Sequence, residues 1–343
     1  MDTHFIDLSP ILSKNKILNF VLGMSLGGKT YQALELAINT WRRYGARTVF
    51  CVRNEIQVST DLLEGLLGEI DKIKTEKNWN LGETIINGSG VDASFSFGEG
   101  KPFLSFKSLH TIFSKKQVTI QNVKWLVFDE FVLNTRSGEK YMKDEITRFK
   151  WLFSKITRGY NYKTRAIFLG NTESAYNPYF AEYGIKPSFL KANTIVAPKN
   201  SEWAVELWVN KDRMKEISAK GLDKVLGGNY GKYAFGCSFL NDRTSLYLNK
   251  IPPKSKPVIS FLCSEGKSIT VWRNAKITLV KNETQSNIVC SCDNLDAVNG
   301  VIYAGLPSFK PIITALKEKA DCGRLFFENA QAENCFFELY NDF

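Results

Sequence analysis

Short apolar runs alternate with longer amphipathic segments through the first half of the chain. The apolar runs predict buried strands, and they lie at residues 17–22, 47–52, 123–128 and 165–169. The segments between them predict helices, at residues 30–44, 60–75 and 140–156. Residues 84–113 instead show short strand patterns separated by glycine turns. Strands that are apolar on both faces and alternate with helices are typical of a parallel sheet covered on both sides.

The pattern changes after about residue 200. Residues 201–250 contain a strand or loop followed by a helix, with breaks at Gly227–Gly231 and then at Ile251–Pro253, which indicates a linker region. Beyond Pro257, four strand patterns and one helical segment, 310–319, predict a small α+β domain. We therefore predict an α/β domain over residues 1–200, a linker region over 201–250 and a C-terminal domain over 251–343.

The composition is that of a globular protein with a basic surface. Hydrophobic residues make up 44% of the 343 residues and charged residues 23%, which is enough apolar material for two cores. The formal net charge of +10 favours a polyanionic partner. No stretch approaches the ~20 apolar residues that a membrane span needs, and residues 1–4 lack the features of a signal peptide. We expect a protein of the cytoplasm with no membrane partner.

The cysteines do not indicate a zinc site. They are odd in number and scattered, with no CxxC pair, at positions 51, 237, 263, 290, 292, 322 and 335. This pattern predicts reduced thiols rather than a disulfide framework. Cys290 and Cys292 would share one face of a strand, where packing in the core explains them best.

The strongest chemical signal is a phosphate-binding motif between the first predicted strand and helix. The residues are Gly23, Met24, Ser25, Leu26, Gly27, Gly28, Lys29 and Thr30, which match GxxxxGK[ST] at every fixed position. Glycines let the backbone curl so that its N–H groups face phosphate oxygens, and the helix N-terminus adds positive potential. In such a P-loop, Lys29 reaches the β- and γ-phosphates of ATP and the Thr30 hydroxyl binds Mg²⁺.

Two adjacent acids follow the strand at 123–128. Asp129 and Glu130 lie at the carboxyl end of that strand, where open α/β sheets bind their ligands. Asp129 is the candidate Mg²⁺ ligand, and Glu130 is the candidate general base that polarises the attacking water. A glutamate beside the metal-binding acid favours a motor that hydrolyses ATP by itself over a kinase.

Asn171 is a weaker candidate, because it follows the strand at 165–169 and a polar residue there can contact the γ-phosphate or its water. An asparagine in a tight turn would look the same. If the protein forms a ring, a basic residue can also reach a neighbour's site, where an arginine finger adds ~10³–10⁵ in rate. The candidates are Lys115, Lys116, Lys155, Arg158, Lys163 and Arg165, with Arg158 favoured by position.

The segments around these motifs resemble a known family. KILNFVLGMSLGGKT, RTVFCVRNE, VKWLVFDEFV and RAIFLGNTESAYNPYF follow the order and spacing of the DNA-encapsidation ATPases of small tailed phages with protein-primed genomes. The resemblance covers most of residues 14–185, is specific at Phe128–Phe131 and Asn177–Phe180, and continues faintly beyond.

The resemblance implies an ATPase domain of the ASCE P-loop class and a C-terminal RNase H-like domain. It implies a homopentameric ring, docked on the portal (connector) of the empty procapsid in the host cytoplasm and absent from the mature virion, that pumps double-stranded DNA. In some members a structural packaging RNA mediates the docking. By position, the resemblance makes Asn171 a coupling residue, Arg158 a trans-acting arginine and Lys116 a trans-acting lysine. It also matches Arg53 to a family arginine without fixing its role.

The C-terminal domain departs from the nuclease domains of larger-phage terminases, which cluster acids on strands to bind two metals. The first strand pattern, Val258–Cys263, has no aspartate, and Asp293 and Glu328 are isolated. We expect no DNA cleavage, in keeping with packaging of unit-length genomes.

Three other classes share part of this signature. A hexameric helicase or recombination ATPase has the same adjacent acids but favours or unwinds single strands. A nucleotide kinase would need no DNA, and a non-catalytic nucleotide-binding assembly protein would not depend on Glu130 for turnover.

Overall fold

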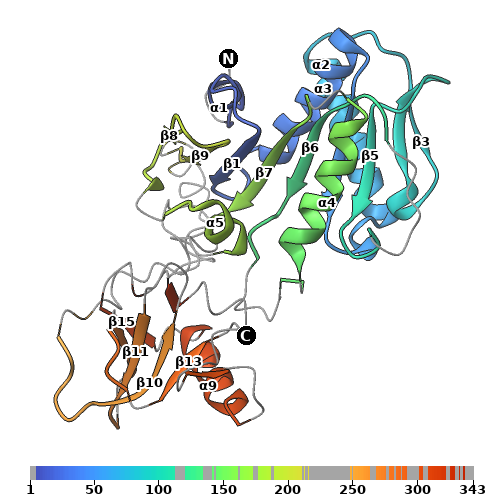
Figure 1. Cartoon of the computed structure of the whole chain (residues 1–343). Helices are drawn as coiled ribbons and strands as arrows, with labels where there is room; N and C mark the ends of the chain where they lie inside the picture. The colour runs from blue at the N-terminus through green and yellow to red at the C-terminus, as the bar shows by residue number, and fades with distance from the viewer. Residues whose placement is uncertain are drawn as a thin grey trace. The chain divides into compact units, whose positions relative to one another are not determined.

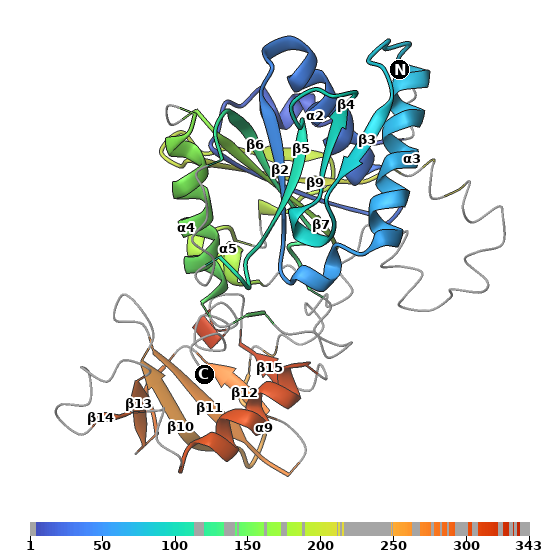
Figure 2. The same cartoon turned by 90° about the vertical axis from the view of Figure 1, so that its right-hand side faces the viewer.

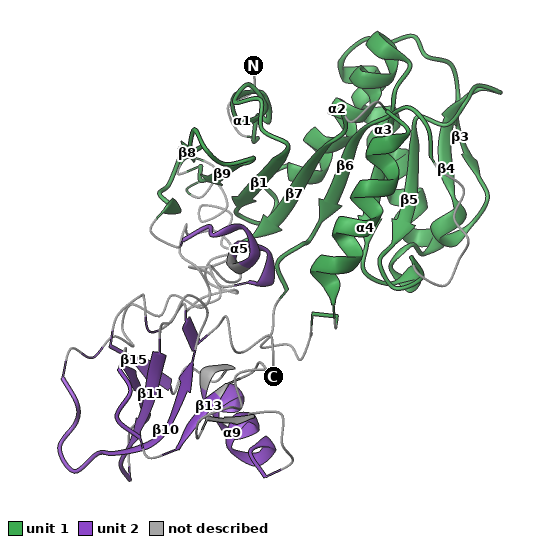
Figure 3. Cartoon of the chain, viewed as in Figure 1, with its two compact units in different colours: residues 1–133, 140–173, 188–240 green, residues 134–139, 174–187, 241–343 purple. Residues whose placement is uncertain are grey.

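The computed structural model of the chain describes a large N-terminal part almost continuously and a C-terminal part in segments. The described residues are 5–112, 120–133, 141–142, 144–160, 163–172, 177–186, 189–210, 212, 215, 248, 250–262, 268–275, 278–281, 283–286, 288–291, 301–303, 308–321, 325–328, 332 and 335–336. Two compact units can be distinguished (Figure 3). Unit 1 comprises residues 1–133, 140–173 and 188–240, and unit 2 comprises residues 134–139, 174–187 and 241–343.

Unit 1 is built on a nine-stranded sheet with the strand order β3-β4-β5-β2-β6-β7-β1-β9-β8 (Figure 1). The strands are β1 (Leu18–Gly23), β2 (Arg47–Val52), β3 (Thr84–Asn87), β4 (Ser94–Phe97), β5 (Leu104–Ser108), β6 (Val123–Asp129), β7 (Arg165–Asn171), β8 (Thr194–Val196) and β9 (Trp203–Trp208). The six strands from β5 to β9 in this order are parallel, and antiparallel strands form the two edges. The predicted α/β fold with a mostly parallel sheet is confirmed for this unit.

Helices cover both faces of this sheet (Figures 1 and 2). On one face lie α2 (Lys29–Tyr44) and α3 (Thr60–Glu76), whose buried residues share one core with the short α1 (Ser9–Leu12). On the other face lies α4 (Glu145–Arg158), where Phe149 packs against Phe128 of β6 and Phe168 of β7. Two short 3₁₀ turns, Glu55–Gln57 and Gly90–Asp92, complete the unit.

The helix boundaries follow local chemistry. The Ser59 hydroxyl accepts a hydrogen bond from the Leu62 amide and caps α3, and Gly45 ends α2 in the left-handed conformation (φ 59°). Helix α4 begins at Glu145, later than the predicted start at residue 140. Asp144 explains the difference, because its backbone is left-handed (φ 58°) and a right-handed helix cannot pass through it.

Strand β9 extends the sheet of unit 1 beyond the boundary predicted at residue 200. It pairs in parallel with β1 along its whole length, from Leu18 beside Trp203 to Gly23 beside Trp208. Residues 203–208 therefore belong to the first unit rather than to a linker. The rest of the predicted linker, from residue 211 to 247, lies almost entirely outside the described residues.

Unit 2 contains a six-stranded mixed sheet with the order β14-β13-β10-β11-β12-β15. The strands are β10 (Lys256–Leu262), β11 (Ser268–Arg273), β12 (Thr278–Lys281), β13 (Val289–Ser291), β14 (Val301–Tyr303) and β15 (Leu325–Phe327). Helices α5 (Pro178–Tyr183) and α9 (Lys310–Asp321) also belong to it. Cys290 is buried in its core, as predicted, whereas Cys292 lies outside the described residues. Within the described part of the chain, no helix has both the length and the apolar character needed to cross a bilayer.

Glu206 of β9 is a buried acid in the core of unit 1. Its side chain is on the same face of the strand as the fully buried Ala204. Its Oε2 atom has no hydrogen-bond partner among the described residues. Burial, together with the nearby charge of Asp7, raises the pKa of Glu206 to about 7.

This carboxyl group makes stability depend on pH. The folded state holds the Glu206 proton more tightly than the unfolded chain, so stability falls as pH rises from about 4.5 to about 7 and stays lower above that range. We expect Glu206→Gln to raise the free energy of unfolding by about 1–3 kcal/mol at pH 8 and to change it little at pH 4. Urea denaturation at both pH values measures this. An equal effect of Glu206→Gln at the two pH values, or the same gain from the exposed Glu202→Gln, would contradict the assignment.

Candidate functional site

The GxxxxGK[ST] motif forms a bend between β1 and α2. Leu26 and Gly28 both have left-handed backbones, with φ 60° and 76°, and the chain enters α2 directly at Lys29. Among the described residues, no side chain caps the N-terminus of α2, and its first turn contains no acid. The bend and the first turn therefore offer backbone N–H groups and positive potential to an anion.

Lys29 is almost buried at the base of this bend, with only 7% of the residue exposed. Its ammonium group donates hydrogen bonds to the carbonyl oxygens of Gly23 (3.2 Å) and Met24 (2.8 Å) and to Oδ1 of Asn171 (2.8 Å). Burial lowers the pKa of Lys29 to about 8, and the nearby carboxylates of Asp129 and Glu130 oppose that shift. Asn171 thus lies at the P-loop, because β7 runs beside β1 and both strands end there.

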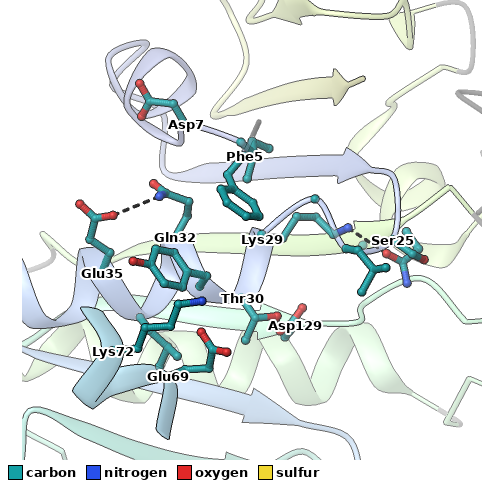
Figure 4. Close-up of a pocket in the computed structure, with 18 of the residues that line it drawn as sticks. Phe5, Asp7, Ser25, Lys29, Thr30, Gln32, Glu35, Glu69, Lys72 and Asp129 are labelled. Atoms are coloured by element: carbon teal, nitrogen blue, oxygen red, sulfur yellow. Dashed lines mark hydrogen bonds between the residues drawn. The ribbon is translucent and has the colours of Figure 1, made fainter. Parts of the chain in front are cut away.

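Thr30 and Asp129 meet across the carboxyl edge of the sheet. The Thr30 hydroxyl donates to Oδ2 of Asp129 at 2.6 Å (Figure 4). Adjacent oxygens of an octahedral Mg²⁺ site lie about 3 Å apart, given Mg–O distances of ~2.0–2.1 Å. A hydroxyl and a carboxylate in this contact therefore fit the donor set for that ion. Burial raises the pKa of Asp129, although the Thr30 hydroxyl and the Lys29 ammonium act in the opposite direction.

Glu130 is exposed at the end of β6 and has a left-handed backbone (φ 55°), which is uncommon for a non-glycine residue. Its amide N–H donates to Oδ1 of Asp129 at 3.0 Å. The two acids therefore differ in their surroundings, because Asp129 is hydrogen-bonded to Thr30 whereas Glu130 is exposed. That difference suits one carboxylate that binds a cation and one that contacts water.

Arg53 fixes this turn from the neighbouring strand. Just beyond the end of β2, its guanidinium donates to the carbonyl oxygens of Glu130 (2.6 Å) and Phe131 (2.5 Å). The same group forms a buried ion pair with Glu145 at the start of α4, at 3.1 Å. Arg53 matches a family arginine in the sequence, but its role and partners could not be predicted. Its place after a buried strand of a parallel sheet was the available signal, since such residues gather at one edge.

A pocket of about 940 Å³ opens beside the bend, within the size range of ligand sites. The P-loop, Asp129, Glu130 and Asn171 line one part of it. Phe5 and Tyr31 line another part, with their rings stacked at a centroid distance of 6.3 Å. Gln32, which also lines the pocket, donates to Glu35 (Figure 4). This aromatic wall could not be predicted from the motif, because neither residue belongs to it.

Those predicted trans-acting residues that the structure describes do not line this pocket. Arg158 is exposed at the end of α4, next to Gly159, whose carbonyl accepts a hydrogen bond from Asn122 at the beginning of β6. That is the opposite end of β6 from Asp129. Lys115 and Lys116 lie outside the described residues. Lys155, Lys163 and Arg165 are described, but none of them lines the pocket.

The described part of unit 2 contains no cluster of acids suited to metals. No group of three or more His, Cys, Asp or Glu residues that could hold an ion is found among the described residues of the chain. Glu328 pairs with Lys281 at 3.5 Å, and Asp293 lies outside the described residues.

Comparisons with solved structures show what the fold resembles. The chain from the bacteriophage phi29 genome packaging motor assembly aligns with a TM-score of 0.63 and 20% identity over 99% of both chains. The phi28 gp11 DNA packaging motor aligns with a TM-score of 0.72 and 17% identity, over 98% of this chain and 97% of that one. Both matches span the two units.

Related sequences give the same result. The DNA packaging protein of Bacillus phage phi29 is 25% identical over 268 residues, which are 78% of this chain and 75% of that protein. The DNA packaging protein of Bacillus phage B103 is 23% identical over 343 residues, covering 96% of this chain and 98% of that protein. The model of the podovirus DNA encapsidation protein (Gp16) family matches residues 1–339, nearly the full length. The chain therefore belongs to the podovirus DNA encapsidation protein (Gp16) family.

Proposed function

We propose that this protein hydrolyses ATP to translocate viral double-stranded DNA into a preformed procapsid. The observation that carries the proposal is the contact between Thr30 and Asp129, which joins the phosphate-binding bend to the two acids at the end of β6. Family membership supplies the cargo, because the phi29 and B103 relatives are DNA packaging proteins.

The triphosphate would lie against the bend at residues 23–30. Lys29 would exchange its contacts with the loop carbonyls for phosphate oxygens and remain within reach of Asn171. Glu130 would accept the proton of the attacking water. As negative charge builds on the γ-phosphate, Lys29 would stabilise it, while Asn171 would contact the γ-phosphate or the water.

Thr30 and Asp129 would hold Mg²⁺, as their mutual distance suits its ligands. When bound, the ion neutralises phosphate charge and orients the β- and γ-phosphates. Glu130, exposed at the end of β6, would contact the attacking water.

Translocation requires that hydrolysis change an interface between subunits. We propose a homopentameric ring that docks on the procapsid portal in the host cytoplasm, in which a basic residue of one subunit completes the site of the next. Arg158 remains the candidate arginine, supported by its exposure, and Lys116 the candidate lysine. A packaging RNA at the docking site remains an expectation from the resemblance to the family.

We also propose that unit 2 is an RNase H-like domain without nuclease activity, and its sheet supports this proposal. If β10 to β14 are numbered 1 to 5 along the chain, they lie in the sheet in the order 5-4-1-2-3. Strands β10, β11 and β12 pair antiparallel in that order, whereas β13 pairs parallel with β10 and β14 pairs parallel with β13. This is the strand arrangement of RNase H-like sheets. Ser260 lies in the middle of β10 and hydrogen-bonds Thr270 at 2.8 Å. A hydroxyl pair at the centre of the sheet does not supply the charge that two metal ions require.

A motor must hold every sequence equally, so DNA binding should be electrostatic. The net charge of +10 supplies the attraction, and release of counterions makes such binding salt-dependent. We expect affinity for duplex DNA to fall by about 10³-fold or more between 50 and 200 mM salt if six or more phosphates are contacted. Filter binding across a salt series, with two unrelated sequences, measures this. Salt-independent binding, or a strong preference for one sequence, would contradict it.

ATPase activity with and without duplex DNA and purified procapsids tests the proposed function. We expect the two additions together to stimulate turnover more than either alone. Stimulation by single-stranded DNA with strand separation would instead identify a helicase, and phosphorylation of a nucleoside phosphate without DNA would identify a kinase.

A further inference from the structure

Gly27 occupies a position of the P-loop motif at which any residue is allowed, so the motif does not explain this glycine. The structure does. A Cβ atom added at Gly27 would lie 2.7 Å from Cζ3 and 3.3 Å from Cε3 of the Trp208 ring. Gly27 does not need its freedom for a left-handed backbone, because its φ is not positive. The glycine is required by the close approach of an indole ring.

Trp208 also lies against the first glycine of the motif. A Cβ atom at Gly23 would be 3.2 Å from the Trp208 carbonyl oxygen and 3.4 Å from Cε3 of its ring. The two residues are partners in the parallel pairing of β1 with β9. One tryptophan thus contacts the beginning of the bend through its backbone and the middle of the bend through its ring.

The position of Trp208 is itself fixed. On the side away from β1, the Asn193 amide donates to the Leu207 carbonyl at 2.6 Å, and the Asn193 side chain accepts from the Val209 amide at 2.8 Å. These bonds hold the residues on both sides of Trp208. The partly buried indole also packs on the core beneath α2. The hydrogen bonds beside Trp208 and the packing of its indole therefore restrain the position of the ring.

The N-terminal segment also contacts the bend. The Ile6 amide donates to the Gly27 carbonyl at 3.0 Å. Backbone N–H groups bind phosphate only when the peptide planes around them are correctly turned, and Gly27 lies next to the left-handed Gly28. Gly27 thus contacts both the Ile6 amide and the Trp208 ring.

We propose that Trp208 is a positioning residue for phosphate binding, which sets the backbone of the P-loop bend through van der Waals contact with Gly27 and Gly23. The proposal rests on the proposed ATPase function. Since the ring touches the loop rather than the substrate, its removal should let the bend relax and turn amides away from the phosphates. Binding of nucleotide should in turn change the surroundings of the indole.

The test compares Trp208→Ala with Trp203→Ala, a matched control at the other end of the same strand. Trp203 is buried and lies beside Leu18, at the end of β1 far from the bend. Both changes remove one indole from β9 and should lower stability. We expect only Trp208→Ala to weaken binding of a fluorescent ATP analogue with Mg²⁺, and to lower kcat/KM by about 10–100-fold. Equal losses in both variants would mean a structural role only and would overturn the proposal.

A compensating pair gives a result that general destabilisation cannot produce. Gly27→Ala should weaken analogue binding because its methyl group meets the Trp208 ring. Trp208→Leu in the same chain should restore part of that binding, since the smaller side chain makes room. Recovery will be partial because the new methyl group also lies 3.0 Å from the Met24 carbonyl oxygen. If the double variant binds no better than Gly27→Ala alone, the contact does not position the loop.

Fluorescence separates failure of this proposal from failure of the proposed function. Tryptophan emission of the wild-type chain should change on addition of the analogue, the change should persist in Trp203→Phe, and it should disappear in Trp208→Phe. If the wild-type chain binds no analogue, the proposed ATPase function fails. If it binds and Trp208→Phe keeps the full change, only the role of Trp208 is overturned.

Discussion

Glu130→Gln is expected to lower kcat for ATP hydrolysis by about 10²–10⁴-fold while leaving nucleotide affinity nearly unchanged. Glutamine keeps the size and polarity of the side chain but cannot accept the proton of the attacking water. Glu130 is exposed at the site, and the Lys29 ammonium is held by the Gly23 and Met24 carbonyl oxygens and by Asn171 rather than by Glu130. Steady-state hydrolysis and equilibrium binding of a labelled ATP analogue measure the two effects separately.

Glu202→Gln is the matched control, because it neutralises an exposed acid that does not line the pocket. It should leave both kcat and analogue affinity unchanged. Full turnover in Glu130→Gln would show that another group acts as the base, or that the protein binds nucleotide without the proposed chemistry. A loss of binding equal to the loss of turnover would place Glu130 in binding rather than catalysis.

Arg53→Ala is expected to reduce the free energy of unfolding by about 3–5 kcal/mol, because it leaves a buried carboxylate without its cation. The side chains of Arg53 and Glu145 are 4% and 2% exposed, so water cannot replace the missing partner. The carbonyl oxygens of Glu130 and Phe131 lose their donors at the same time. Urea denaturation of the purified chain measures the change.

The exposed pair Lys215–Asp212 provides the comparison, with side chains 80% and 77% exposed. Lys215→Ala should change stability by less than about 1 kcal/mol. A second variant, Arg53→Met with Glu145→Gln, removes both charges and should be less destabilised than Arg53→Ala. If the double variant is no more stable than the single one, an unpaired charge is not the cause.

Much of unit 1 could be predicted because local pattern and tertiary structure agree there. Strand β2 has the predicted bounds, and β1, β6 and β7 differ from them by two residues or fewer at either end. These strands are buried on both faces, so their apolar runs are continuous and clearly bounded. The bend at residues 23–30 was predicted from its motif, and the acids 129–130 from their place at the carboxyl end of a buried strand, since parallel strands bring these ends to one edge.

The features that sequence reasoning missed depend on contacts distant in the chain. Trp208 reaches Gly27 only because β9 adds to the sheet beside β1, and its own segment carried no motif. The local signal for this contact was Gly27, because a glycine at a motif position that allows any residue indicates that another group lies close to the backbone. The late start of α4 follows from the left-handed Asp144, which periodicity cannot reveal. Arg158 was chosen by its place in the sequence, and whether it completes a neighbouring site depends on an interface that one chain does not contain.

Encapsulation of DNA tests the central claim most directly. Wild-type protein, purified procapsids, genomic duplex DNA and ATP are combined, and DNA protected from added nuclease inside the procapsids is measured. We expect protected, full-length DNA with the wild-type chain and ATP, and background levels with Glu130→Gln or without ATP. Equal protection by Glu130→Gln, or protection that needs no ATP, would contradict the claim that hydrolysis at this P-loop drives DNA into the capsid.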